Sequence, residues 1–356
     1  MLFEQTIFLT GFPGFIGERL VERLAAANRQ MLLLVQSHFV PSAVSKIENI
    51  AKITGTPLEN FAVIEGDICQ PGLGMSEEDL EFVRINSTHI FHLAAIYDLA
   101  VPREIAIKVN VEGTLHVNKL AGSMPNLARY SYISTCYVAG KRAGMIREDE
   151  LEHNAGFRNF YEESKYLAEC EVEKLKDSLS VTIFRPSVVV GDSKTGETAK
   201  YDGIYYLVQY LLKAPRLLSL INVGNEKVKL NLVPVDFIVD SIAELAFDRE
   251  AEGKTLALAD PDPNTTRELF DLIAQAAAGR GSAFDPPPSL VEWCLMLPFS
   301  PALTGLPHSG VPYFFLEQEY DTSVSAALLS KHGIRCPRFA DYVKDLLDFV
   351  KMHPML

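Results

Sequence analysis

The sequence predicts an α/β fold in which a doubly wound parallel sheet is followed by a smaller C-terminal region. Three observations support this prediction. Short β-branched or aromatic runs alternate with helical patterns through the first half of the chain, as expected when helices cover both faces of a parallel sheet. A glycine-rich turn lies directly after the first of these runs. The regular alternation is lost after Arg185.

Six strands are predicted in the first half of the chain. Between the first two, residues 15–27 carry Ile16, Leu20, Val21 and Leu24 at helical spacing, with charged residues on the other face. Strand, helix and second strand therefore form a βαβ unit. The predicted strands are residues 6–10, 31–35, 62–66, 89–93, 130–134 and 181–185.

The composition is that of an ordinary globular protein and excludes several classes of function. Of the 356 residues, 48% are hydrophobic and 22% are charged, which argues against disorder. The formal net charge of −13 repels a phosphate backbone, so no nucleic acid partner is expected. The five cysteines are scattered, without CxxC pairs or a nearby set of histidines. This pattern predicts a reducing, cytoplasmic setting and no metal site.

Neither a secretory signal nor a membrane span is expected. The first five residues lead directly into a strand-like run, without a basic segment followed by an apolar one. The apolar stretch at residues 290–315 is interrupted by Glu292, Pro298, Pro301 and Pro307, which a membrane-spanning helix accommodates poorly. We interpret this stretch as a pocket wall or lid.

The glycine-rich turn lies between the first strand and the first helix, where a dinucleotide pyrophosphate needs it. Gly11 permits the tight turn, Gly14 lets a phosphate approach the backbone, and Gly17 allows the helix to pack closely. The helix N-terminus adds free N–H donors and a favourable dipole. The sequence therefore predicts a dinucleotide site formed by Gly11, Phe12, Pro13, Gly14, Phe15, Ile16 and Gly17.

The G-x-x-G-x-x-G spacing of this turn resembles the extended branch of the short-chain dehydrogenase/reductase superfamily. Later motifs agree with the resemblance in the same order along the chain. Asp67, followed by Ile68, ends the third strand, where the family's aspartate binds the adenine amino group. Ala94 and Ala95 end the fourth strand, where the family places small residues against the cofactor. The next helical segment opens with Asn110, which we assign to the catalytic group.

The sequence contains two Y-x-x-x-K patterns, and their placement separates them. Tyr137 and Lys141 follow the fifth strand with Gly140 between them, so no helix is expected to bring them to one face. Tyr161 and Lys165 open a run rich in Glu, Lys, Leu and Ala, which favours a helix. Their i, i+4 spacing puts the phenol and the ammonium on one side of that helix.

The chemistry of a proton-transferring phenol explains this arrangement. A free phenol has a pKa of about 10, and a nearby ammonium is expected to lower the pKa of Tyr161 and make the phenol useful near neutral pH. Thr135 lies at the end of the fifth strand, where its hydroxyl can hold a substrate oxygen. Ser134 is its neighbour and remains the alternative, although aligning Gly140 with the family's usual glycine favours Thr135.

Two later passages resemble the thioester and fatty acyl-CoA reductase-like, male-sterility type members of the extended branch. They are FRPSVVVGDSKTGET, from residue 184, and VPVDFIVD, from residue 233. The resemblance implies that hydride passes from a reduced cofactor to the carbonyl of an acyl thioester or aldehyde, while Thr135 and Tyr161 stabilise the developing oxyanion. It also implies that the loop after the sixth strand borders the nicotinamide, through Pro186, Val188 and Val189.

The region after Arg185 is interpreted as substrate-binding structure. It contains an aromatic helix near residues 201–212, a short strand near 227–233 and a proline-rich linker at 279–288. A helix at 237–247 is expected to return to the main sheet. An apolar substrate chain suits its large apolar residues, namely Tyr205, Tyr206, Leu211, Leu212, Leu217, Trp293, Leu295, Phe314 and Phe315, although most of them are expected in the core.

These elements give a predicted division of the chain. The dinucleotide-binding Rossmann domain takes residues 1–190, with residues 234–250 returning to it. Residues 191–233 and 251–338 form the substrate-binding region, and 339–356 the C-terminal helix, whose helical pattern covers 339–351.

The cofactor preference is predicted from the end of the second strand. Gln36 and Ser37 occupy the position where an acidic residue normally binds the ribose hydroxyls and disfavours a 2′-phosphate. NADP is therefore expected, with NAD as the alternative, and His38 and Lys46 could supply positive charge.

Two other functions remain open on the sequence. One keeps the fold and catalytic group in a hydroxyl (sterol-like) dehydrogenase or nucleotide-sugar epimerase, and the other is an NAD(P)-sensing protein without turnover. The expected partner is a small apolar acyl or carbonyl molecule, and the family implies a homodimer through helices near residues 111–120 and 161–175.

Overall fold

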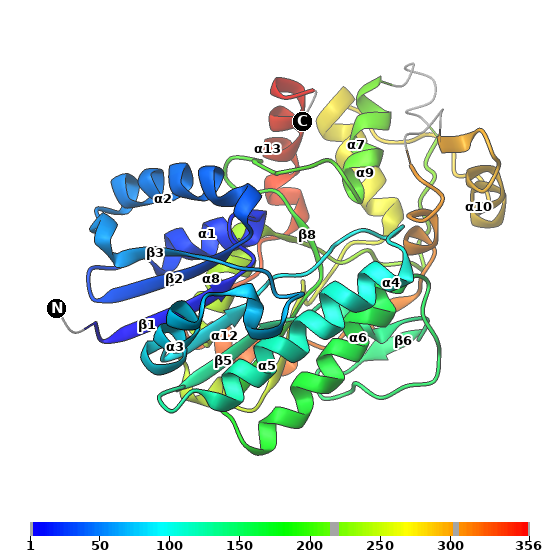
Figure 1. The fold of residues 1–356 in the computed structure, drawn as a ribbon. Helices are drawn as coiled ribbons and strands as arrows, with labels where there is room; N and C mark the ends of the chain where they lie inside the picture. The colour runs from blue at the N-terminus through cyan, green and yellow to red at the C-terminus, as the bar shows by residue number, and fades with distance from the viewer. Residues whose placement is uncertain (1–2, 214–220, 302–305, 355–356) are drawn as a thin grey trace.

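The computed structural model describes residues 3–213, 221–301 and 306–354. Its centre is a sheet of seven parallel strands in the order β10-β7-β5-β4-β1-β2-β3 (Figure 1). The order reverses beside β1, which pairs with β2 on one side and β4 on the other. The predicted doubly wound fold is confirmed. The strands are β1 (Gln5–Thr10), β2 (Arg29–Val35), β3 (Phe61–Glu65), β4 (His89–His92), β5 (Arg129–Ile133), β7 (Val181–Pro186) and β10 (Thr255–Leu258).

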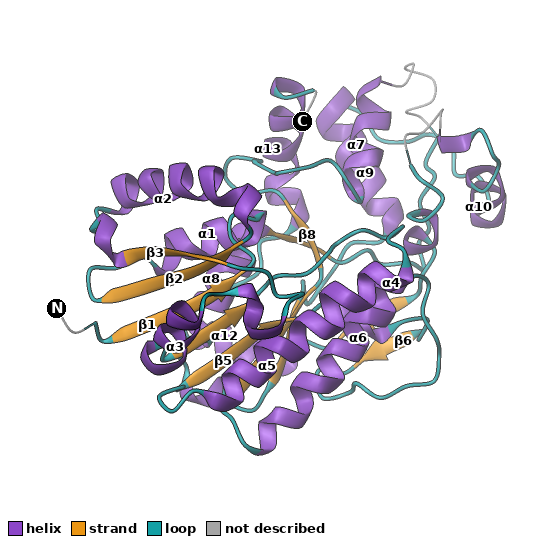
Figure 2. Ribbon diagram, viewed as in Figure 1, coloured by secondary structure: helices purple, strands orange, loops and turns teal. Residues whose placement is uncertain are grey.

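Helices cover both faces of this sheet, each with its own hydrophobic core (Figure 2). The first core contains residues of α1 (Phe15–Leu24), α2 (Val40–Thr54), α8 (Val235–Leu245) and α12 (Ser323–Lys331). The second contains residues of α3 (Glu77–Asn86), α5 (Gly113–Ser123) and α6 (Phe160–Glu173). The strands are buried on both sides, which explains their continuous apolar runs.

A third core lies beside the carboxyl ends of the strands and belongs to the region after Arg185. It joins α7 (Ile204–Lys213), α9 (Thr266–Ala278) and α13 (Phe339–Met352), with α10 (Pro288–Leu295) farther out (Figure 1). Two small parallel ribbons complete this side, pairing β8 (Val188–Val190) with β9 (Leu232–Pro234) and β6 (Gly144–Ile146) with β11 (Gln318–Tyr320).

The structure differs from the sequence-based division at several boundaries. Thr255–Leu258, assigned to the substrate-binding region, forms strand β10 at the edge of the main sheet beside β7. The helix α12 also packs on α8 and β10, whereas α13 joins the third core. The strand expected at 227–233 is confined to β9, and the segment before it makes only an isolated bridge between Lys229 and Thr265. The four residues 255–258 are too few to show a strand pattern in the sequence. They are recognised as a strand only by their pairing with β7.

Candidate active site

The glycine turn leaves no space for side chains. A Cβ on Gly17 would lie 2.5 Å from the carbonyl oxygen of Gly11, and one on Gly14 would lie 2.8 Å from the same atom. Gly11 itself has φ of 97° and backs onto Leu93 and Ala94 at the end of β4, with 2.9 Å to a built Cβ. No side chain caps the N-terminus of α1, so its first N–H groups can receive an anion. This geometry fits a dinucleotide pyrophosphate.

A cavity of about 400 Å³ opens directly in front of this turn. It brings together the ends of four strands with helix α6, although these segments are far apart in the sequence. Predicted residues that line it are Gly11, Gly14, Phe15, Ile16, Gly17, Ala94, Ala95, Ser134, Thr135, Tyr161, Lys165, Pro186, Val188 and Val189. The lining also contains residues that were not predicted as site residues, namely Leu93, Tyr97, Ile133, Tyr137, Ser187, Thr198, Ala199, Lys200 and Asp202.

Tyr161 and Thr135 meet inside this cavity. Burial raises the pKa of Tyr161 above its ordinary value, and a hydrogen bond with the Thr135 side chain acts in the opposite direction. The ring of Tyr97 packs edge-on against Tyr161, with 5.1 Å between centroids. The expected lowering of the pKa of Tyr161 by Lys165 is therefore wrong for this structure, because loss of solvation outweighs the favourable contacts of the phenol.

Lys165 lies on the same helix but directs its ammonium elsewhere. Its Nζ donates to the phenol oxygen of Tyr132 at 3.0 Å and to the carbonyl oxygen of Ile133 at 2.8 Å. Burial lowers the pKa of Lys165 to about 8, with the charge of Glu169 acting against this. The ammonium is thus held at the end of β5, and Lys165 is part of the cavity lining.

Ser134 and Thr135 point to different surroundings, as neighbours on extended backbone do. The Ser134 hydroxyl donates to the buried carboxylate of Glu169, which also pairs with Arg185 at 2.5 Å. The Thr135 oxygen accepts from the backbone N–H of Tyr137 at 3.2 Å and contacts Tyr161. Both residues line the cavity, and of the two hydroxyls that of Thr135 interacts with the Tyr161 phenol.

Asn110 lies behind the cavity and is absent from its lining. Its Oδ1 accepts from the N–H of Ile96 at 2.8 Å, and its Nδ2 donates to the Ser164 hydroxyl at 2.9 Å. The side chain thereby ties the segment after β4 to helix α6. Asn110, predicted as part of the catalytic group, therefore does not face this cavity.

Several predicted cofactor residues lie outside the cavity lining. Phe12 is buried in the core under α1, and the carbonyl oxygen of Pro13 accepts from Lys46 at 3.4 Å. Gln36 is exposed at the end of β2. Asp67 accepts from the N–H of Cys69 at 2.9 Å, and Ile68 is buried. Gln36, Asp67 and Ile68 follow the carboxyl ends of β2 and β3, at the same end of the sheet as the glycine turn.

The end of β2 carries a contact that the sequence did not predict. Ser37 donates a hydrogen bond to the carboxylate of Glu65, which ends the neighbouring strand β3. Lys46, proposed as a source of positive charge, pairs with Glu18 on α1.

In the Y-x-x-x-K pattern that follows the fifth predicted strand, the Tyr and Lys side chains do not form a pair. Tyr137 lies in a short 3₁₀ turn, Cys136–Ala139, whereas Lys141 is exposed. The Tyr137 ring instead packs against Tyr313, with 4.6 Å between centroids.

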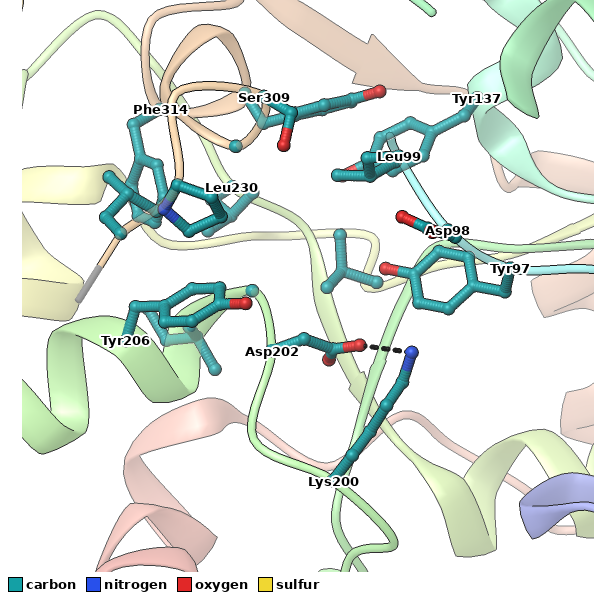
Figure 3. A pocket seen from close by; sticks show the side chains of 17 residues that line it. Tyr97, Asp98, Leu99, Tyr137, Lys200, Asp202, Tyr206, Leu230, Ser309 and Phe314 are labelled. Atoms are coloured by element: carbon teal, nitrogen blue, oxygen red, sulfur yellow. Dashed lines mark ion pairs between the residues drawn. The ribbon is translucent and has the colours of Figure 1, made fainter. Parts of the chain in front are cut away.

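A second cavity, of about 340 Å³, adjoins the first and shares five lining residues with it (Figure 3). Lys200 and Asp202 form an ion pair of 2.7 Å on one side, and the Lys200 ammonium lies 4.2 Å from the centre of the Tyr97 ring. Leu230 and Phe314 lie on another side (Figure 3). The shared residues are Tyr97, Tyr137, Val188, Lys200 and Asp202.

The large apolar residues predicted for substrate binding divide into several groups. Tyr206 and Phe314 line the second cavity, and Leu295 and Phe315 line a further cavity beyond it. Tyr205, Leu211 and the half-buried Leu212 pack in the third core, Trp293 is 63% exposed, and Leu217 falls outside the described residues. The stretch predicted as a pocket wall contributes Leu306, Pro307, Ser309, Gly310, Tyr313 and Phe314 to the second cavity.

The described parts of the chain contain no helix long and apolar enough to cross a bilayer. They also contain no group of three or more His, Cys, Asp or Glu side chains that could bind a metal ion.

Comparison with known proteins agrees with the geometry. A family model for NAD-binding sequences, described as male sterility protein, matches residues 9–242. The chain belongs to this family. The family is part of the extended short-chain dehydrogenase/reductases, which are NAD(P)-dependent oxidoreductases. The resemblance inferred from the sequence, and the enzyme class that it implied, are confirmed.

Individual male sterility family relatives are distant in sequence. Fatty acyl-CoA reductase wat of Drosophila melanogaster is 27% identical over 281 residues, covering 69% of this chain and 54% of the relative. The L-2-aminoadipate reductase large subunit of Penicillium chrysogenum is 25% identical, covering 71% of this chain and 19% of the relative. The chain thus spans about half the length of the first relative and less of the second.

A solved structure matches nearly the whole chain. The terminal R domain from the myxalamid PKS-NRPS biosynthetic pathway superposes with a TM-score of 0.81 at 26% identity, covering 99% of this chain and 92% of that chain. The similarity therefore extends beyond the family match into the region after residue 242.

Proposed function

We propose that the chain is an NAD(P)H-dependent reductase of acyl thioesters or aldehydes that carry an apolar chain. The observation that carries this proposal is the meeting of Thr135 and Tyr161 in a cavity walled by the glycine turn. The names of the relatives support it, since one is a fatty acyl-CoA reductase and another an L-2-aminoadipate reductase. When bound, the reduced nicotinamide supplies the hydride.

The catalytic side chains of the chain act on the oxygen of the substrate's carbonyl group. The hydroxyls of Thr135 and Tyr161 donate hydrogen bonds to this oxygen and stabilise the negative charge that develops on it. Burial keeps the phenol of Tyr161 protonated at neutral pH, so the phenol transfers its proton to the oxygen as the carbon is reduced. With a thioester, the resulting hemithioacetal then expels the thiol and leaves the aldehyde.

Lys165, which lines the cavity, supports this chemistry. Its ammonium, held by Tyr132 and Ile133, adds a positive charge that stabilises the negative charge developing on the carbonyl oxygen. Asn110 acts as a positioning residue, because its bonds to Ile96 and Ser164 fix helix α6 against the segment after β4.

The test is NADPH oxidation with an aldehyde and an acyl-CoA of the same apolar chain. We expect turnover by the wild-type chain and a loss of about 10²- to 10⁴-fold in kcat for Tyr161→Phe. Tyr166→Phe, on the same helix but outside the cavity lining, is the control and should retain activity. Undiminished activity of Tyr161→Phe would overturn the assignment. Oxidation of hydroxysteroids or epimerisation of nucleotide sugars, without aldehyde reduction, would favour the other functions.

We also propose that NADP is the preferred cofactor, because Gln36 and Ser37 replace the usual acidic residue at the end of β2. Glu65 opposes this preference. Its carboxylate accepts a hydrogen bond from Ser37 and would repel a 2′-phosphate bound there. Glu65→Gln should therefore strengthen NADPH binding by a few-fold, through about 0.5–1 kcal/mol, and leave NADH binding unchanged. A titration of both cofactors by fluorescence measures this, and an equal change for both would contradict it.

The setting and assembly are further proposals. All five cysteines are free thiols, which supports a reducing, cytoplasmic compartment. A homodimer through α5 and α6 is supported by Leu115 and Phe160, which are 42% and 43% exposed on these helices. Sedimentation of the wild-type chain and of Leu115→Glu tests it.

A further inference from the structure

A third cavity lies beyond the second one and is walled by apolar side chains. It has a volume of about 90 Å³ and is formed by α7, α9, α10 and the segments around Val223 and Phe315. Among the described residues that line it, none carries a charge. They are Tyr206, Leu207, Tyr210, Val223, Gly224, Thr266, Phe270, Leu295, Leu306, Phe314 and Phe315.

The three cavities adjoin one another in series and share wall residues. The third shares Tyr206, Leu306 and Phe314 with the second, and the second shares five residues, Tyr97 and Val188 among them, with the first. The first contains the hydroxyls of Thr135 and Tyr161. A chain attached to a carbonyl group between these hydroxyls would extend toward the second cavity and, beyond it, the third.

Polarity falls along this path. The Lys200–Asp202 ion pair lies at the junction of the first two cavities, with the Lys200 side chain 56% exposed to solvent. Farther on, Tyr206 and Phe314 line the second cavity on the side away from Tyr97 (Figure 3). The third cavity then offers aliphatic and aromatic walls, apart from the Thr266 hydroxyl and the tyrosine oxygens. The Thr266 hydroxyl already contacts the backbone of Asn225.

We propose that the third cavity receives the distal end of the substrate's apolar chain and thereby limits the length of chain that the enzyme accepts. This inference rests on the proposed function and names its substrate class more closely. A cavity of about 150 Å³ holds one benzene molecule, so a cavity of about 90 Å³ takes only the last few carbons. Each methylene that enters improves affinity by about fourfold, and longer chains gain nothing once the space is full.

Two substitutions change the size of this cavity in opposite directions. Val223→Phe adds bulk at a half-buried wall, and Phe315→Ala removes bulk from the opposite segment. Val44→Phe is the matched control, because Val44 is 43% exposed on α2 and lines none of the three cavities. All three variants are made in the full chain and checked for unchanged thermal unfolding.

The first measurement is kcat/KM with NADPH across straight-chain aldehydes of increasing length. For the longest chain that the wild type uses well, Val223→Phe should lower kcat/KM by about tenfold or more, equivalent to about two excluded methylenes, while short aldehydes stay within about twofold. Phe315→Ala should extend the accepted length, and Val44→Phe should follow the wild type.

The second measurement does not require turnover. Straight-chain primary alcohols are titrated into the NADPH-loaded enzyme by calorimetry, and affinity should rise with length to a limit that Val223→Phe shortens. If aldehydes are not reduced but this limit shifts, the cavity assignment stands and the proposed reaction fails. If aldehydes are reduced but neither Val223→Phe nor Phe315→Ala alters the length profile, the cavity assignment is overturned.

Discussion

The two sides of the active cavity are built from different kinds of structure. On the cofactor side, the walls are strand ends and the glycine turn, where contacts of 2.5–2.9 Å to built Cβ positions fix the backbone itself. On the substrate side, the walls are side chains from α7, α9 and the segment around Tyr313, supported by the third core and by two short ribbons. We therefore expect cofactor binding to depend on the backbone, and substrate choice to depend on side chains that can be replaced.

The largest expected effect concerns the framework under the cofactor side. Glu169 and Arg185 form a buried ion pair, 0% and 4% exposed in their side chains, that also holds Ser134. Glu169→Gln leaves the Arg185 charge uncompensated and should lower the free energy of unfolding by about 3–5 kcal/mol. Urea denaturation measures this. The control is Glu81→Gln, which breaks an exposed pair with Arg84. If Glu169→Gln lowered the free energy of unfolding as little as Glu81→Gln does, the buried pair would not support the framework.

The glycine turn should respond next most strongly. The Cβ in Gly17→Ala would lie 2.5 Å from the Gly11 oxygen, and relieving such an overlap costs about 1–3 kcal/mol, so NADPH binding should weaken by roughly ten- to a hundredfold. Gly122→Ala, where a Cβ meets nothing within 4 Å on helix α5, should leave binding unchanged and stabilise the fold by about 0.5–1 kcal/mol. Equal cofactor affinity in the two variants would refute the role of the turn.

The charge of Lys165 gives a pH dependence on the same side. Burial lowers the pKa of Lys165 to about 8, so the ammonium is charged below that pH and neutral above it. If the reaction requires the charge, kcat should fall by about tenfold per pH unit above about 8. Pre-steady-state rates with a saturating aldehyde measure this profile. In Lys165→Met the alkaline decline should disappear together with most of the activity, and a wild-type rate that stays level through this range would contradict the prediction.

The smallest effect is expected where the substrate side touches the catalytic helix. The Tyr313 hydroxyl donates to Glu162 at 2.5 Å and accepts from Asn159 at 2.7 Å, at the start of α6 beside Tyr161. Tyr313→Phe should lower kcat by roughly fivefold, equivalent to about 1 kcal/mol, and leave the Kd for NADPH unchanged. Tyr320→Phe removes a hydroxyl that bonds only to Gln318 in the same segment and serves as control. If Tyr313→Phe weakened NADPH binding and left kcat unchanged, Tyr313 would belong to the cofactor side of the cavity.

The sequence signals on the cofactor side are local. Each strand is one short apolar run, and the turn is seven consecutive residues with glycine at every third position. The spacing of Tyr161 and Lys165 gave their shared helix, but it could not give the direction of the pKa shift of Tyr161, which is set by burial of a phenol that packs against Tyr97. Nor could it show that Ser134 turns to Glu169, since that contact joins residues 35 positions apart.

The sequence by itself determined the parallel sheet, the dinucleotide turn and the family, because these follow from patterns within short segments. Only the tertiary structure decided the seventh strand, the partners of Lys165 and Asn110, and the series of cavities beyond the cofactor. The physical reason why the sequence did not predict these features is the same in each case. A short edge strand, a buried charge or a cavity wall is defined by neighbours that come from distant parts of the chain, and no local pattern records which neighbours those will be.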